Sequence, residues 1–203
     1  MIFMVSFFSF HSALPTVLDL GIAFVMSPIS PLPVLNAQKE FVKNLLNAFT
    51  ISNTDTRLGF MKYGREAKIV YTLRELTSLR NAYVGLDDIT LDNPGYNMLS
   101  VLKQAKTKFF QPSFGARQNA PKSLFIFNNG ASGILESDLK EEADALRDMG
   151  VKIVVLGVGG DTDPDELKVI ASNRDAYFFV DDLPNINRYL NPITTQLQPG
   201  KLK

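Results

Sequence analysis

Few side chains in this chain are suited to acid–base, nucleophilic or redox chemistry. His11 is the only histidine among the 203 residues, and there is no cysteine. A Ser/His/Asp triad, thiol catalysis and a zinc site with histidine or thiolate ligands therefore lack the residues they need. The sequence also offers no pair of carboxylates that can be assigned as a catalytic acid and base. These observations favour a binding protein over an enzyme.

Three glycine-rich or aspartate-rich segments deserve comparison with known binding motifs. Gly157–Gly160 follows an apolar run, but a dinucleotide-binding loop needs a further glycine at position 162, which is Thr162. Aspartates alternate within residues 161–165, yet the glycine and the glutamate of a calcium-binding loop are missing. We interpret these glycines as a tight strand exit, the alternating aspartates as the solvated start of a helix, and Asp181–Asp182 as turn carboxylates in solvent.

Apolar runs of strand length alternate along the chain with amphipathic stretches of helical length, a pattern typical of parallel strand–helix–strand units. Leu20–Met26 and Val151–Val158 are continuous apolar runs, which predict strands buried on both faces. The short loop Gly64–Glu66 between Arg57–Tyr63 and Ala67–Tyr71 predicts a hairpin with an antiparallel strand at one edge. We therefore predict an α/β fold: a doubly wound, mostly parallel central sheet with one antiparallel edge strand and helices on both faces.

The same patterns place the other elements. Strands are predicted at Ser123–Phe127 and Ala176–Val180. Helices are predicted at Leu35–Phe49, Leu73–Tyr83, Tyr96–Phe110, Ser137–Met149, Asp163–Ser172 and Leu183–Leu197. Ser137 is expected to cap its helix, and Asp163–Pro164 to begin the next one.

Length and charge limit the organisation of the chain. We predict a domain over residues 18–197, a preceding segment 1–17, and a tail 198–203, because the length suits one core. Met1–Phe10 is almost wholly apolar, so the first segment is either a signal-peptide core or an extension of the domain, and it is too short to insert across a membrane. The 21 basic residues balance the 21 acidic ones, which argues against a nucleic-acid partner.

Three segments carry a recognisable pattern: Arg57–Tyr63 (RLGFMKY), Gly150–Gly159 (GVKIVVLGVG), and Asp165–Ala171 followed by Phe178–Val180. In these segments and in the order of its elements, the chain resembles von Willebrand factor type A domains, especially those of collagen VI and matrilin-like matrix proteins. The resemblance covers about residues 18–197. It implies a Rossmann-like sheet with functional loops at the carboxyl ends of its strands, and a secreted protein of the extracellular matrix.

The resemblance also implies a metal-ion-dependent adhesion site, and here the chain departs from the family. In the family's D-x-S-x-S loop, Met26 replaces the aspartate, Pro28 replaces the first serine, and Ser30 is retained. Of the second loop, T-x-T-x-x-G, the chain keeps Thr90, and in the third loop, T-D-G, Asn129 replaces the aspartate.

Both charged ligands of the family's cation are therefore absent. Mg²⁺ and Ca²⁺ bind hard oxygen ligands and need carboxylates for tight binding, so we predict a degenerate site with no metal and no cofactor. An altered site remains as an alternative, in which Ser30 and Thr90 act together with Asp92 or Asp88.

One further candidate site lies on the predicted loop Gln111–Pro121. Phe110, Phe114 and Arg117 flank or occupy this loop, and exposed aromatic and arginine side chains are favoured at protein interfaces. We interpret them as an interaction site, with packing of the aromatics back onto the surface as the alternative.

Three functions are compatible with these features. The leading hypothesis is a noncatalytic, metal-independent interaction or assembly module of an extracellular matrix protein, with matrix proteins such as collagens, or sister domains, as partners. The alternative is a cation-dependent cell-adhesion domain with the altered metal site. An enzyme that binds a nucleotide is supported only by the α/β architecture, and architecture alone does not define function.

Overall fold

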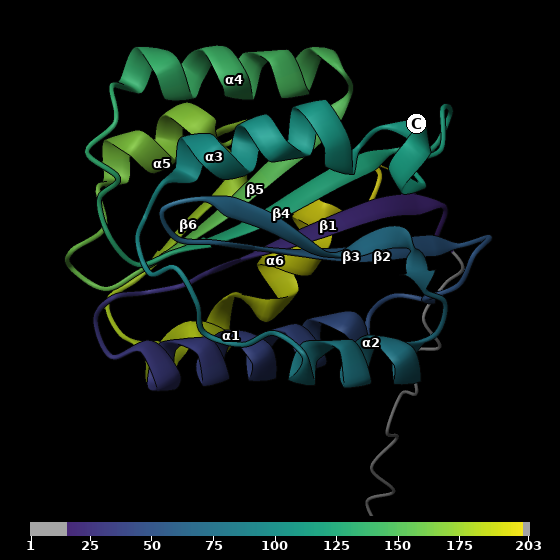
Figure 1. Cartoon of the computed structure of the whole chain (residues 1–203), viewed down its shortest axis with the longest axis horizontal. Coiled ribbons are helices and arrows are strands. Elements are labelled where there is room, and N and C mark those ends of the chain that lie inside the picture. The colour runs from purple at the N-terminus through teal and green to yellow at the C-terminus, as the bar shows by residue number, and fades with distance from the viewer. Residues whose placement is uncertain (1–15, 201–203) are drawn as a thin grey trace, which may run out of the picture.

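A six-stranded sheet in the order β3-β2-β1-β4-β5-β6 forms the centre of the structure (Figure 1). The computed structural model describes residues 16–200. The strands are β1 (Leu18–Val25), β2 (Thr56–Tyr63), β3 (Ala67–Leu76), β4 (Lys122–Asn128), β5 (Val151–Val158) and β6 (Tyr177–Val180). Neighbouring strands are parallel except for β2 and β3, which are antiparallel. The predicted mostly parallel sheet with one antiparallel edge strand is confirmed.

Helices cover both faces of the sheet, so that the protein has three layers (Figure 1). The helices are α1 (Pro31–Leu46), α2 (Leu79–Asp87), α3 (Met98–Gln104), α4 (Glu136–Asp148), α5 (Pro164–Ile170) and α6 (Leu190–Leu197). Figure 1 shows α1, α2 and α6 on one face and α3, α4 and α5 on the other. This is the doubly wound arrangement expected from the alternation of strands and helices.

The central strand β1, which lies beside β4 in the middle of the sheet, is buried along its whole length because helices cover both faces of the sheet. On the α3 face, Gly21 of β1 pairs in register with Gly59 of β2. A Cβ atom at Gly21 would lie 2.7 Å from Cε1 of Phe109, and one at Gly59 would lie 2.8 Å from Cζ of the same ring. The paired glycines therefore form the flat surface on which the Phe109 ring packs.

Aromatic side chains fill the core on the opposite face. Phe127 of β4 stacks on Phe24 of β1, with 5.9 Å between ring centroids, and meets Phe41 of α1 edge-on at 5.7 Å. The hydroxyl of Tyr63, at the end of β2, donates a 2.6 Å hydrogen bond to the carbonyl of Phe127. This contact fixes the carboxyl end of β2 relative to that of β4, across β1.

The predicted helix Leu73–Tyr83 is wrong in its first part. Strand β3 continues to Leu76, which pairs with Leu58 after two irregularities in register. The helix begins only at Leu79, where the side chain of Ser78 accepts a hydrogen bond from the backbone N–H of Asn81. Pairing with β2 thus overrides the helical spacing of the apolar residues.

Other predicted helices also differ in their ends or their type. Helix α4 begins at Glu136, with Leu135 as N-cap, so the predicted cap at Ser137 is wrong. The predicted helix start at Asp163–Pro164 is confirmed: α5 begins at Pro164, and the carboxylate of Asp163 caps it by accepting hydrogen bonds from the N–H groups of Asp165 and Glu166. Helix α3 continues into a π-helical turn, Ala105–Phe109, and α6 follows a 3₁₀ segment, Leu183–Tyr189.

The described elements begin at Leu18 and end at Leu197. Met1–Phe10 lies outside the described residues, and the domain limits 18–197 stay a prediction. No helix within residues 16–200 is both long enough and apolar enough to cross a membrane.

Candidate functional site

The loops at the carboxyl ends of the parallel strands form the candidate site. From β1 the chain adds β2 and β3 on one side of the sheet, and then adds β4, β5 and β6 on the other side. The strand order therefore reverses between β1 and β4. In open α/β sheets, ligands bind at the carboxyl ends of the strands beside such a switch point. The loop after β1 begins at Met26, the loop after β4 at Asn129, and the loop after β5 at Gly159.

Ser27 occupies the centre of this site and is almost completely buried. Its hydroxyl donates to the carbonyl of Ile29 at 2.6 Å and accepts from the backbone N–H of Ile29 at 3.1 Å. The same oxygen accepts a 2.9 Å hydrogen bond from Nδ2 of Asn129. A serine hydroxyl has one hydrogen to donate and two lone pairs, so these three contacts use its full capacity.

The sequence analysis did not single out Ser27, and instead took Ser30 as the retained hydroxyl of this loop. Ser30 is exposed and has a left-handed backbone (φ 47°), and its side chain makes no capping hydrogen bond to α1. Pro28 is also exposed, whereas the side chain of Met26 is buried. Ser27 is the first hydroxyl after the buried run of β1, and this position is the signal by which it could have been found.

The loop that follows Thr90 contacts the loop after β1 through backbone and side-chain groups. The N–H of Gly95 donates a 2.9 Å hydrogen bond to the carbonyl of Met26. The ring of Tyr96 packs against Gly130, where a Cβ atom would lie 2.4 Å from the ring. The hydroxyl of Tyr96 lies 3.4 Å from Oγ of Ser27. Neutral side chains therefore fill the space between these loops.

The loop after β4 is held in place by α5 and by the loop after β5. Glu166 of α5 is buried, and its carboxylate accepts hydrogen bonds from the N–H groups of Ser132 (2.9 Å) and Gly133 (3.1 Å). The N–H of Ala131 donates to the carbonyl of Asp161 at 2.8 Å. These contacts fix the position of Asn129 relative to the end of β5.

Thr90 and Asp92 do not converge on Ser27 and Asn129 as free ligands. Thr90 is exposed, and its carbonyl accepts a hydrogen bond from Nζ of Lys62. The carboxylate of Asp92 forms ion pairs with Lys62 (3.2 Å) and Lys68 (3.0 Å). Burial acts to raise the pKa of Asp92, but the hydrogen bonds from Lys68 and Lys62 outweigh it, and the pKa is lowered. The charge of Asp92 is therefore already neutralised.

Asp88, the other carboxylate of the altered-site alternative, accepts a hydrogen bond from the hydroxyl of Tyr71. This contact raises the pKa of the Tyr71 hydroxyl. Within residues 16–200, no three histidine, cysteine, aspartate or glutamate side chains lie close enough to hold a metal ion.

A small apolar cavity lies beside this loop cluster. Its volume is about 230 Å³. It is lined by Met26, Ser27, Pro28, Pro31, Leu91, Asp92 and Pro94. The thioether of Met26 thus belongs to an apolar wall, in the position where the sequence comparison expects a carboxylate.

Three of the exposed large apolar side chains lie at the same end of the sheet, and Val17 and Val84 are exposed elsewhere. Ile29 is 55% exposed, Leu32 in the first turn of α1 is 61% exposed, and Leu135 before α4 is 70% exposed. A contiguous apolar patch marks a surface suited to contact with another protein, whereas single exposed apolar side chains are common on protein surfaces.

The predicted interaction residues lie at the opposite end of the sheet. Phe110 is 3% exposed and packs edge-on against Phe109, so its expected exposure is wrong. Phe114 is half-buried. Arg117 forms a 2.8 Å ion pair with the buried carboxylate of Asp19 and also donates to nearby backbone carbonyls.

Arg117 therefore has a structural role at the start of β1, because it satisfies a carboxylate that is fully buried. Phe114 is the member of the predicted group with accessible aromatic surface. A binding role for the loop stays a prediction.

The sheet order, the helices on both faces and the loop cluster define a Rossmann-like interaction domain. The sequence model of the von Willebrand factor type A domain matches residues 32–192, and the chain belongs to this family. Cochlin from Bos taurus is 25% identical over 173 residues, which cover 80% of this chain and 31% of cochlin. The collagen alpha-6(VI) chain from Homo sapiens is 25% identical over 165 residues, 80% of this chain and 7% of that one.

A solved structure gives the same fold. Proximal thread matrix protein 1 from the mussel byssus superposes with a TM-score of 0.83 at 19% identity, over 89% of this chain and 48% of that chain. Another structure of the mussel protein has a zinc-occupied MIDAS motif, the metal-ion-dependent adhesion site. The present chain spans less than a third of either curated relative. The resemblance to type A domains of matrix proteins is confirmed.

Proposed function

We propose that this chain is a noncatalytic protein-interaction or assembly module of a secreted extracellular matrix protein, and that it binds its partner without a divalent cation. The family and the matrix relatives support an interaction module. Metal independence is our inference from the side chains of the loop cluster. Partners among matrix proteins, including collagens, and among sister domains are consistent with these relatives.

The observation that carries the proposal is the hydrogen-bonding state of Ser27. All three hydrogen-bonding positions of its hydroxyl are used, one of them by Asn129. A cation would have to displace Asn129 or the backbone of Ile29, and would gain only neutral ligands. Dehydration of Mg²⁺ or Ca²⁺ is normally offset by carboxylates, so the residues present do not fit the family's cation.

The alternative, a cation-dependent adhesion domain, needs Asp92 as a replacement ligand. Two lysine ammonium groups already lie against that carboxylate. A dication in the same place would be repelled by both ammonium groups, or would have to break both ion pairs. The structure therefore supports the alternative less well than the metal-independent module.

In place of a metal, the loop cluster offers apolar contact. Ile29 and Leu32 are exposed, and their sequence neighbours Pro28 and Pro31 line the apolar cavity together with Met26. The cavity suits the end of an apolar side chain from a partner, and burial of such a group stabilises a complex by about 1.5–3 kcal/mol. This arrangement of a pocket with exposed apolar neighbours is typical of interface centres.

Thermal unfolding tests the proposal directly. The full chain is unfolded in EDTA and then with millimolar Mg²⁺, Ca²⁺ or Mn²⁺, and we expect the same melting temperature in each case. A native-state site with a Kd of about 10 µM would raise the melting temperature by roughly 5–10 °C at these concentrations. Such a rise would refute metal independence and favour the adhesion domain.

A further inference from the structure

Leu135 is the most exposed large apolar side chain among the described residues, and it stands at the start of α4. It is 70% exposed and follows the loop after β4, so it lies at the carboxyl end of the sheet. The carboxylate of Glu166 holds this loop in place, because it accepts hydrogen bonds from the N–H groups of Ser132 and Gly133. A side chain presented on an ordered loop loses little further freedom when it enters a partner.

The surface around Leu135 is acidic. Glu136 and Asp138 lie in the first turn of α4, and both side chains are exposed. Asp138 is three residues after Leu135 and therefore lies on the same face of the helix. Among residues 16–200, the ion pairs of α4 engage Glu142 and Asp144 but neither of these two carboxylates. A partner for Leu135 must therefore combine an apolar recess with positive charge.

The cavity beside Met26 has an apolar wall of suitable size. Its volume is about 230 Å³, and an apolar cavity of about 150 Å³ already holds a group as large as benzene. The tip of the β2–β3 hairpin lies beside it, because the N–H of Arg65 donates a 3.1 Å hydrogen bond to the carbonyl of Asn93, next to Pro94 in the cavity wall. Arg65 is exposed, and its guanidinium makes no hydrogen bond or ion pair within residues 16–200.

The charges on this side of the cavity leave a positive balance. Lys62 and Lys68 share the single carboxylate of Asp92, and Arg65 is followed by Glu66 at the hairpin tip. Three basic and two acidic side chains give a net charge of +1. The hairpin side of the cavity is therefore complementary in charge to the first turn of α4.

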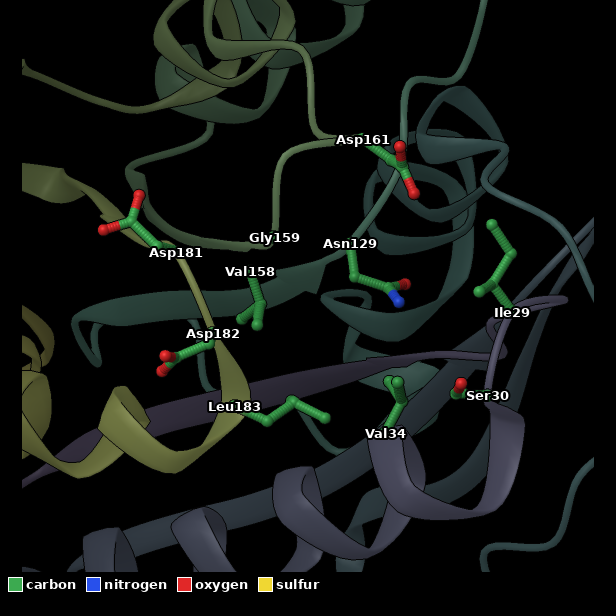
Figure 2. Close-up of a pocket in the computed structure, with 10 residues that line it drawn as sticks. All are labelled: Ile29, Ser30, Val34, Asn129, Val158, Gly159, Asp161, Asp181, Asp182 and Leu183. Carbon is green, nitrogen blue, oxygen red and sulfur yellow. The ribbon is translucent and has the colours of Figure 1, made fainter.

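A second cavity, on the other side of the β1–α1 loop, does not fit the surroundings of Leu135. Its volume is about 210 Å³, and it lies where the ends of β4, β5 and β6 meet (Figure 2). Asp161, Asp181 and Asp182 line it, and in Figure 2 the carboxylate of Asp161 points toward its interior. These charges repel another acidic surface. Of the two cavities, the one beside Met26 is thus the electrostatic match.

We infer that the cavity beside Met26 binds Leu135 of a second copy of this chain, and that the first turn of α4 lies against the β2–β3 hairpin of that copy. The leucine and the cavity lie on separate loops at the same end of the sheet. A twofold axis therefore lets each copy give one leucine and receive one, so that the contact occurs twice in a dimer. This inference rests on the proposed function and names a sister domain as the partner.

Charge reversal tests the pairing. Asp138→Lys and Arg65→Glu each place like charges in both contacts of a dimer, and each should raise the dimer Kd about tenfold or more. In an equimolar mixture of the two variants, the reversed acid of one chain meets the reversed base of the other, and the unchanged groups form the second contact. We expect this mixture to form a heterodimer with a Kd within about threefold of that of the unchanged chain. Sedimentation equilibrium of the full-length chains measures these constants.

Two further variants locate the contact. Leu135→Ser removes the apolar group and should raise the dimer Kd about tenfold or more. Asp148→Lys reverses a charge at the other end of α4 and should leave the Kd unchanged. The four substituted positions are exposed, and an unchanged far-UV circular dichroism spectrum confirms that each variant folds.

Three results would overturn the inference: an unchanged chain that stays monomeric at about 1 mM, no heterodimer in the mixture of charge-reversed variants, or an unaltered Kd in Leu135→Ser. None of them refutes the proposed function, which the melting experiment with divalent ions tests separately. Conversely, a rise in melting temperature with an ion would refute metal independence even if the dimer forms.

Discussion

At the scale of single residues, a neutral hydrogen-bond network stands where the family's pattern has charged ligands. Ser27 and Asn129 bond to each other, and the Tyr96 ring packs on Gly130 beside them. Ser30, which the sequence comparison favoured, lies outside this network in solvent. Which of the two serines enters the network depends on the direction in which the side chains at the end of β1 point.

Replacement of the two serines measures this difference. Ser27→Ala leaves the N–H of Ile29 and Nδ2 of Asn129 without their acceptor, and should lower the free energy of unfolding by about 1–3 kcal/mol. Ser30→Ala is the matched control and should change it by less than about 0.5 kcal/mol, because its hydroxyl is exposed. Urea unfolding of both variants measures the two values. A larger loss in Ser30→Ala would contradict the network described here.

At the scale of elements, the contact between the sheet and the α3 face depends on small residues in β1 and β2. Gly21 and Gly59 lie side by side, and the ring of Phe109 from the π-helical turn packs directly on them. Glycine in a strand is ordinarily unfavourable, and here it permits this close approach. The contact sets the distance between β1 and the helix layer, and β1 in turn positions Ser27.

A double-mutant cycle tests this packing. Gly21→Ala places a methyl group against Phe109 and should destabilise the fold by about 1–3 kcal/mol, as overpacked cores do. Phe109→Leu removes ring atoms and should relieve part of that strain, so the double variant loses less stability than the sum of the single ones. Gly160→Ala is the control, since a Cβ atom there meets nothing within 4 Å. Simple additivity, measured by urea unfolding, would rule out the proposed contact.

At the scale of the whole molecule, the two ends of the sheet have different surfaces. The carboxyl ends of the strands carry exposed apolar residues, an apolar cavity and an acidic cavity. The other end also has an exposed apolar residue, Val17, and a cavity beside Phe110 and Met149, but its arginine, Arg117, is engaged in the ion pair with the buried Asp19. The loop cluster and its exposed apolar residues make the carboxyl end the surface on which we expect a partner to bind.

Substitution of the exposed apolar residues tests the location of the interface. The double variant Ile29→Ser/Leu32→Ser should weaken binding to immobilised matrix collagens, or to a second copy of the chain, by about tenfold or more in EDTA. Val84→Ser on α2 is the control, because Val84 is 59% exposed but lies on a helix outside the loop cluster. Surface plasmon resonance compares the three proteins. Equal loss in the control, or none in the double variant, would place the interface elsewhere.

The sequence by itself determined the fold class, the antiparallel edge hairpin and the absence of carboxylates at two expected ligand positions. These features depend on residue identity and on local periodicity, which follows from the backbone geometry of helices and strands. The start of α2 was missed because pairing of β3 with β2 outweighs the local helical pattern.

Only the tertiary structure decided which side chains meet. It brought Asn129 to Ser27, placed Lys62 and Lys68 on Asp92, buried Phe110, and engaged Arg117 with Asp19. Each of these outcomes joins residues that are far apart in the sequence or depends on how a helix packs on the sheet. No local pattern specifies such contacts, since they result from the packing of complete elements against one another.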